Sequence, residues 1–344
     1  MSWYGTQGED RDVVLSSRVR LARNIENYPM GELLSRDKAN EIIVRTGAAL
    51  GDEYERVDFT KLDYVSAAAY VEEHLVSADF AKLHSPHALY KCEHRSTYIM
   101  VCEEDHLRIQ SITAGFSPDA AYAHAAEAAD KLAGAFDIAF DDKLGYLTHC
   151  PTNLGTGMRV SLMMFLPALT KFGQIPSVSR QLGKLGVTVR GMYGEGSEAT
   201  GCLYQISNQV TLGISEEETV SKLKKIAASI TESERKMRRA LTEPANIDET
   251  SDSISRAYGT LLFARKLSGA EFMRLWVRAR LGISLCNTDA GCEGLLPDSL
   301  SYEKLDTLLI EAQPAVLTLL SGGGELSPQE RDIKRSALVR TRIN

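Results

Sequence analysis

Short apolar and β-branched runs, bounded by turn-forming residues, mark much of the first two thirds of the chain as strand-forming. We expect strands at 12–25, 97–103, 106–113, 145–149, 157–166, 186–192 and 202–212. An acidic turn, Glu103–Asp105, separates two of these runs and predicts an antiparallel pair. Several other connections are too short for the helical crossover that parallel strands need, so the sheet is expected to be mainly antiparallel.

Apolar residues spaced about 3.6 apart predict helices between and after these strands. They are expected at 35–50, 64–75, 117–135, 177–185 and 215–241, with Ser35 and Ser117 as N-caps and Pro118 in a first turn. Beyond the polar, proline-containing segment 242–250 the pattern becomes almost wholly helical. Amphipathic runs there lie near 251–267, 269–281, 301–320 and 327–342.

These patterns predict an α+β fold, with a mainly antiparallel sheet flanked by helices and a small all-α C-terminal domain. A chain of 344 residues exceeds what one hydrophobic core usually organises, which also favours two units. We place an α+β domain at 1–245 and a helical domain at 246–344.

Composition narrows the class of protein. Hydrophobic residues make up 44% and charged residues 25%, and no run is long and apolar enough to span a membrane. The N-terminus lacks the features of an export signal, and six scattered cysteines suggest reduced thiols, so a cytoplasmic location is expected. A net charge of −7 argues against nucleic acid as a partner, although arginines can still gather in one cleft.

Four segments carry candidate chemistry. Ser16–Arg20 places Arg18 and Arg20 two residues apart on a strand, so both point to one side and suit a polyphosphate. The turn Glu103–Asp105 crowds three carboxylates next to Arg108, which suits a cationic ligand. The loop 150–159 begins with Cys150 and ends with Arg159, and the glycine-rich segment 190–199 is typical of a loop that closes over a ligand.

Taken singly, each segment also fits ordinary structure: a solvated basic strand face, an acidic hairpin tip, a packed thiol or a surface loop. Together they supply arginines for phosphate charge, carboxylates for a guanidinium and a closing loop. That combination is typical of phosphoryl transfer.

Read as a set and in this order, the motifs resemble the catalytic domain of the phosphagen kinases, the ATP:guanido phosphotransferase family, over roughly residues 12–240. The resemblance implies their glutamine synthetase-like antiparallel sheet, and ATP with Mg²⁺ carried by the nucleotide rather than a metal site of the protein. The residues that it assigns to ATP binding are Ser16, Ser17, Arg18, Val19, Arg20, His74, Arg108, Arg159, Val160, Ser161, Leu162, Met163, Arg190, Gly191, Met192, Tyr193 and Gly194.

The resemblance also implies catalytic roles. Glu104 matches the guanidine-binding carboxylate and candidate base, with Glu103 next to it, and Glu195 matches the loop glutamate of arginine-specific members. Cys150 matches the cysteine that packs against the guanidine. Two carboxylates can align a guanidinium and accept its proton, which the guanidinium, with a pKa above about 12, does not release by itself.

Some features depart from the family pattern. Phosphagen kinases carry a helical domain before the double-arginine motif, which here begins at residue 16, so we expect a guanidine pocket open enough for an arginine on a protein surface. Cys102 stands where asparagine is common, and Tyr193 stands where free-arginine kinases have arginine. Because the catalytic glutamates are present, activity is expected with an altered substrate fit.

The helical tail is similar to the C-terminal domain of protein-arginine kinases, which supplies a dimer contact and a phosphoarginine pocket. The pocket motif corresponds to Arg331, Asp332, Arg335 and Ser336, where Ser336 replaces the usual alanine. Arg331 and Arg335 are four residues apart on a helix, so both are expected to face one anion, although a solvated helix face is the alternative.

We therefore predict a kinase that transfers the γ-phosphoryl group of Mg-ATP to arginine in proteins and marks them for degradation under stress. The resemblance implies substrates with surface arginines, a homodimer, an activator protein and a Clp-type protease machinery as partners. Two other functions stay open: a kinase of free guanidines, and a phosphoarginine-binding adaptor without catalysis.

Overall fold

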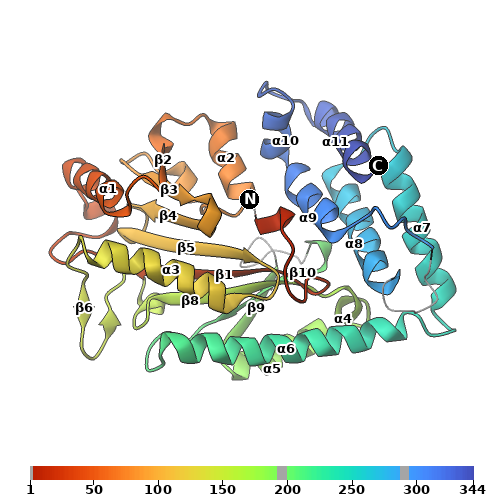
Figure 1. Cartoon of the computed structure of the whole chain (residues 1–344), viewed down its shortest axis with the longest axis horizontal. Helices are drawn as coiled ribbons and strands as arrows, with labels where there is room; N and C mark the ends of the chain where they lie inside the picture. The colour runs from red at the N-terminus through yellow and green to blue at the C-terminus, as the bar shows by residue number, and fades with distance from the viewer. Residues whose placement is uncertain (1–2, 192–199, 287–293) are drawn as a thin grey trace.

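The computed structural model describes residues 3–191, 200–286 and 294–344. In this part of the chain an eight-stranded antiparallel sheet has the order β2-β3-β4-β5-β1-β8-β10-β9 (Figure 1). Its strands are β1 (Val14–Arg23), β2 (Glu55–Asp58), β3 (Ala88–Cys92), β4 (Thr97–Val101), β5 (Leu107–Ala114), β8 (Met158–Phe165), β9 (Val187–Gly191) and β10 (Leu203–Asn208). A separate two-stranded hairpin consists of β6 (Phe140–Asp141) and β7 (Gly145–Tyr146).

The helices of this part are α1 (Arg36–Leu50), α2 (Tyr64–Glu72), α3 (Pro118–Ala133), α4 (Pro167–Lys171), α5 (Ile175–Lys184) and α6 (Glu216–Ala240). All of them except α2 contribute to the core on one face of the sheet, whereas α2 packs against Met100 on the opposite face. Val19 and Leu21 of β1 share a core with residues of α1, α3 and α6, and both side chains are buried. Because side chains alternate along a strand, Arg18 and Arg20 point to the opposite face.

The last third of the chain is helical and packs at one end of the sheet (Figure 1). Its helices are α7 (Ile247–Phe263), α8 (Gly269–Cys286), α9 (Tyr302–Glu311), α10 (Pro314–Leu320) and α11 (Pro328–Ile343). Leu15, Phe165 and Leu203, at the ends of three central strands, lie in the same core as Trp276 of α8. The predicted boundary at 245 falls between α6 and α7 and stays a prediction.

Buried arginines join the helical part to the first strand. The Arg280 guanidinium is fully buried; it donates to Asp306 at 2.8 Å and to the Arg11 carbonyl at 2.7 Å. Its Cζ also lies 4.8 Å from the centre of the Phe165 ring. A buried cation of this kind is tolerated only when paired and hydrogen-bonded, so these contacts fix the two parts against each other.

Most of the predicted elements are confirmed. Ser35 caps α1 by accepting from the Lys38 amide, and Ser215 and Glu218 form a capping box at the start of α6. The acidic turn joins β4 to β5 as an antiparallel pair. The eight-stranded antiparallel sheet with flanking helices confirms the predicted α+β class.

Several predictions were wrong in detail. The strands β2 and β3 were not predicted, and the strand expected at 145–149 is reduced to Gly145–Tyr146. The helix expected at 301–320 is divided into α9 and α10 before Pro314, which lacks the amide hydrogen that a continuous helix needs. Ser117 does not cap α3 with its side chain; its hydroxyl bonds Thr113 and the Ala114 carbonyl instead.

Candidate active site

A cavity of about 350 Å³ opens on the sheet face that carries Arg18 and Arg20. Five arginines line it, and they come from four different strands: β1, β5, β8 and β9. They are Arg18, Arg20, Arg108, Arg159 and Arg190. The sequence placed these residues in separate motifs spread over more than half of the chain, and the sheet brings them to one place.

Strand register explains how the arginines meet. Arg20 of β1 lies opposite Arg159 of β8, while Ala22 lies opposite Arg108 of β5. Neighbouring strands lie about 4.8 Å apart, so these guanidinium groups lie close enough to repel one another. Hydrogen bonds hold two of them: Arg159 Nη2 donates to Ser207 Oγ at 3.0 Å, and Arg18 Nε donates to Ser161 Oγ at 3.4 Å.

Burial and mutual repulsion perturb the central arginines. Burial, with the charges of Arg108 and Arg159, lowers the pKa of Arg18 to about 10. Burial, with the charges of Arg18 and two other arginines, lowers the pKa of Arg20 well below its usual value. Both groups remain cationic at neutral pH, so the cavity is prepared for a polyanion that relieves the repulsion.

The three consecutive carboxylates of the β4–β5 turn have different surroundings. Glu104 is exposed and lines the cavity, and burial of its carboxylate together with the charge of Asp105 raises its pKa. Glu103 is nearly buried and binds Ser77 and Arg108. Asp105 is buried and accepts from Asn24 Nδ2 at 2.6 Å and from the His149 amide at 2.8 Å.

These contacts place the two glutamates differently. Glu104 can reach a ligand in the cavity, whereas the two oxygens of the Glu103 carboxylate already accept from Ser77 and Arg108. A catalytic role for Glu103 stays a prediction. Glu195 lies outside the described residues, as do Met192, Tyr193 and Gly194.

The loop between β7 and β8 forms another wall of the cavity. Cys150 lines it, and its thiol lies 3.1 Å from the Thr152 hydroxyl. Sequence reasoning included Asp105, Thr152 and Asn153 in its candidate segments without giving them a role, and it missed Gln205 as a lining residue. Gln205 follows the alternation of β10, but only the pairing of β10 with β8 and β9 shows which of its faces meets the arginines.

Comparisons with known proteins agree with this geometry. Residues 38–237 match the family described as ATP:guanido phosphotransferase, C-terminal catalytic domain, and residues 248–344 match the protein-arginine kinase McsB C-terminal domain. The chain belongs to the ATP:guanido phosphotransferase family. It is 40% identical to a protein-arginine kinase of Caldanaerobacter subterraneus subsp. tengcongensis, over 97% of this chain and 98% of the relative. A protein-arginine kinase of Halothermothrix orenii is 39% identical over 99% of this chain and 96% of its own.

Solved structures of other kinases share the fold. A duplicated taurocyamine kinase from Schistosoma mansoni with bound transition state analog components has a TM-score of 0.60 and 22% identity. The match covers 75% of this chain and 40% of the taurocyamine kinase chain. Lombricine kinase has a TM-score of 0.57 and 23% identity over 67% of this chain and 68% of its own. At these identities the likeness concerns the fold alone.

Four residues assigned to ATP binding in this phosphotransferase have side chains on the helix-covered face. Val19, Val160 and Leu162 are fully buried in the core beneath α1, α3 and α6. The Ser17 hydroxyl donates to the Gly115 carbonyl at 2.8 Å and accepts from the Ser117 amide at 2.9 Å. Alternation along β1 and β8 leaves only every second side chain on the cavity face, so these four side chains do not line the cavity. The assignment of these residues to ATP binding stays a prediction.

The remaining assigned residues that the structure describes lie on or beside the cavity face. Ser16, His74, Ser161 and Met163 line a smaller cavity of about 20 Å³, which shares Arg18 with the main one. Gly191 is buried at the end of β9, one residue after Arg190. The role of each of these residues stays a prediction.

The predicted phosphoarginine pocket in α11 differs from its expected geometry. Arg335 is buried; it donates to the carbonyls of Ala312 at 2.9 Å and Leu267 at 2.8 Å, and to Asp332 at 2.9 Å. The Ser336 hydroxyl donates to the Arg265 carbonyl at 2.7 Å. Arg331 is only partly buried. The two arginines therefore do not present equally available guanidinium groups to one anion, because Arg335 already holds α11 against its neighbours.

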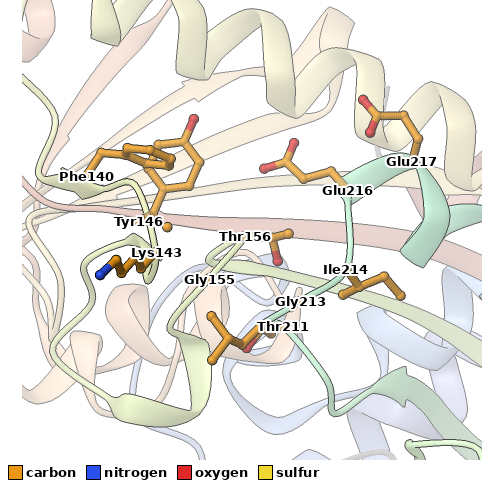
Figure 2. A pocket seen from close by; sticks show the side chains of 12 residues that line it. Phe140, Lys143, Tyr146, Gly155, Thr156, Thr211, Gly213, Ile214, Glu216 and Glu217 are labelled. Atoms are coloured by element: carbon orange, nitrogen blue, oxygen red, sulfur yellow. The ribbon is translucent and has the colours of Figure 1, made fainter.

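A second cavity of about 410 Å³ includes Gly155 and Thr156 of the β7–β8 loop in its lining (Figure 2). Phe140, Tyr146, Glu216 and Glu217 are among its walls. Glu216 accepts from Arg23 at 2.9 Å and from the Tyr122 hydroxyl at 2.8 Å, so it is paired within the protein. None of the assigned active-site residues that the structure describes lines this cavity, and its paired carboxylate distinguishes it from the arginine-lined site.

Among the described helices, none has the length and apolar character that crossing a membrane requires.

Proposed function

We propose that this chain is a protein-arginine kinase, which transfers the γ-phosphoryl group of ATP to the guanidino group of arginine residues in proteins. One observation carries the proposal: five arginines and the accessible carboxylate of Glu104 line the same cavity. The arginines suit a triphosphate, and the carboxylate suits the guanidinium that receives the phosphoryl group.

The chemistry assigns a task to each group. The bond between the γ-phosphorus and its bridging oxygen breaks, a bond from phosphorus to a guanidino nitrogen forms, and ADP leaves. The nitrogen loses one proton, for which Glu104 is the proposed acceptor. Burial and Asp105 raise the pKa of Glu104, which makes it a better proton acceptor near neutral pH than an ordinary carboxylate.

The arginines hold and neutralise the phosphates during transfer. Their positions are fixed by the strand ladder and by contacts such as Arg159 with Ser207, so little reorganisation is needed as charge moves onto ADP. Glu103 positions Arg108 through their ion pair. The second carboxylate that the sequence predicts for the guanidinium, Glu195, remains part of the proposal.

Mg²⁺ is proposed to enter with ATP. The described residues contain no cluster of three or more side chains suited to hold a metal ion. In kinases Mg²⁺ is commonly bound by phosphates and water with few protein ligands. When bound, it would neutralise phosphate charge together with the arginines.

Protein arginine is the preferred acceptor because the relatives named protein-arginine kinase match almost the whole chain, including the helical part. The exposure of Glu104 supports this choice, since an arginine that projects from a protein surface must reach the carboxylate from outside. A kinase of free guanidines would instead phosphorylate free arginine and leave proteins unmodified.

The test compares two adjacent glutamates. The protein is incubated with Mg-ATP and an arginine-rich protein, and acid-labile phosphoarginine is measured by mass spectrometry. We expect Glu104→Gln to lower kcat by about 10²–10⁴ without weakening nucleotide binding. Glu103→Gln should instead raise the KM for ATP, because Arg108 loses its partner.

Three results would overturn the proposal. Phosphoserine or phosphotyrosine as the only product would exclude a guanidino kinase, and turnover of free arginine alone would select the small-guanidine function. Binding of phosphoarginine proteins without any ATP turnover would indicate an adaptor. An unchanged kcat in Glu104→Gln would mean that another group accepts the proton.

We further propose that phosphorylation marks proteins for degradation during stress, that the chain forms a homodimer, and that an activator protein and a Clp-type protease work with it. These partners are implied by the resemblance of the helical tail to the C-terminal domain of protein-arginine kinases, a domain that residues 248–344 match. The dimer is tested by light scattering on the purified protein. A cytoplasmic location and the phosphoarginine pocket of α11 remain predictions.

A further inference from the structure

The short 3₁₀ helix Trp3–Gly5 places an aromatic ring at one end of the arginine cavity. Trp3 is 4% exposed and lines the small cavity that shares Arg18 with the main one. Its ring centre lies 6.1 Å from that of His74, at an interplanar angle of 49°. The ring therefore adjoins the phosphate-binding face, although its sequence position gave no sign of this.

The lining of this small cavity differs in chemistry from the main cavity. Ile112 and Met163 contribute apolar surface, and Ser16 and Ser161 contribute hydroxyl groups. Burial and the charge of Arg18 lower the pKa of His74 to about 4, so its imidazole is neutral at physiological pH. Charged arginines on one side and neutral, largely apolar groups on the other match a ligand with an anionic end and a flat, uncharged end.

We propose that Trp3 is a base-binding residue of the nucleotide site, where its indole ring stacks on the adenine of ATP. The inference rests on the proposed function, because it takes ATP as the phosphoryl donor. Aromatic side chains bind nucleobases through their π-faces, and each such contact contributes substantially to affinity.

The size of the small cavity shows that one wall must move. Its volume is about 20 Å³, which is room for about one water molecule and far less than a purine needs. Ser16, Ile112, Ser161 and Met163 lie on paired central strands, which cannot shift without breaking the ladder. Trp3 belongs to a helix of three residues, so it is the wall that can yield.

The contacts of Trp3 give it a defined position before the nucleotide binds. Its indole Nε1 donates to the Glu73 carbonyl at 3.2 Å, just after α2. The adjacent Tyr4 carbonyl accepts from Arg11 Nη2 at 2.5 Å, and Arg11 in turn pairs with Asp306 of α9 at 3.1 Å. Trp3 also packs in a hydrophobic core with residues of β4, β5 and α10, and a stacked base would replace part of this packing.

The first experiment separates the base from the phosphates. Dissociation constants of Mg²⁺-ADP and Mg²⁺-tripolyphosphate are measured by calorimetry for the whole protein, Trp3→Ala and Trp3→Phe. We expect Trp3→Ala to weaken ADP binding roughly tenfold and to leave tripolyphosphate binding unchanged, because tripolyphosphate has no base to stack. Trp3→Phe should keep most of the ADP affinity.

A spectroscopic experiment tests the contact without removing it. The sequence has two tryptophans, and Trp276 is fully buried in the helical part. In Trp276→Phe, the emission of Trp3 should change when ADP binds and stay nearly constant with tripolyphosphate.

Two outcomes would overturn the inference. One is an equal loss of ADP and tripolyphosphate affinity in Trp3→Ala, which would show a structural role. The other is an unchanged ADP affinity in Trp3→Ala. Failure of the wild-type protein to bind ADP at all would instead refute the proposed function, so the two ideas are distinguished.

Discussion

Arg18 should destabilise the ligand-free protein. Burial, with the charges of Arg108 and Arg159, lowers its pKa from the ordinary value of an arginine to about 10. At 1.36 kcal/mol for each pKa unit, that difference corresponds to about 3 kcal/mol. Both the folded and the unfolded protein carry this charge at neutral pH. The full cost therefore applies below about pH 10 and disappears as the pH rises towards 12.5.

Replacing Arg18 with glutamine removes the charge and keeps part of the side chain. Solvent at the cavity mouth screens some of the repulsion, and the bond to Ser161 is lost, so we expect a gain in unfolding free energy of about 1–3 kcal/mol. Arg18→Gln should thus be more stable than the wild type without ligand and should bind tripolyphosphate more weakly. This is the trade of stability for function that is expected at a preorganised site.

The assay is urea unfolding followed by circular dichroism, with and without tripolyphosphate. Arg256→Gln is the control, because its side chain is 79% exposed on α7 and its charge is expected to change stability by less than about 0.5 kcal/mol. A lower midpoint for ligand-free Arg18→Gln, at an unchanged slope, would refute the reasoning. So would equal stabilisation of the wild type and Arg18→Gln by tripolyphosphate, since the ligand would then gain nothing from Arg18.

Three further predictions follow from the contacts. Arg335→Met should lower the unfolding free energy by about 2–4 kcal/mol in urea titrations, because two backbone carbonyls and a carboxylate lose a buried partner. As the control, Arg331→Met should change the unfolding free energy much less. His74 has a pKa of about 4, so its contribution to stability is present above pH 6.5 and is lost as the pH falls towards 4. The difference in unfolding free energy between His74→Gln and the wild type should therefore change by up to about 3 kcal/mol over that interval. No change would contradict the lowered pKa of His74. Glu72→Gln should lower the unfolding free energy by about 1 kcal/mol in the same titrations, because the Glu72 carboxylate accepts from the Ala315 amide at the start of α10. An unchanged midpoint would show that water replaces this cap.

Local sequence determined many of the elements. The alternation Ser16–Arg20 is enough to place two arginines on one side of a strand, and the pair Ser215 and Glu218 is enough to start a long helix. These signals succeed because the physical causes, side-chain alternation and satisfaction of helix-end amides, act within a few residues.

Other local signals were overruled by neighbours distant in sequence. Ser117 has the sequence position of a helix cap, yet its hydroxyl bonds the end of β5 while its amide bonds Ser17. Arg335 lies at the expected spacing from Arg331, yet its guanidinium is occupied by the carbonyls of Leu267 and Ala312. No pattern within α11 indicates those partners, because they come from before α8 and after α9.

By itself, the sequence determined which residue types the active site uses, since arginines, adjacent carboxylates and a thiol appear in separate recognisable motifs. Only the tertiary structure decided which of these residues line the cavity and which are held by other protein groups. The turn that holds Glu103 against Ser77 and Arg108 leaves Glu104 open to the cavity, and strand pairing excludes Val19 and Val160 while it admits Gln205. The N-terminal helix brings Trp3 beside His74 for the same reason: these relations depend on strand register and packing between distant segments, which no local pattern encodes.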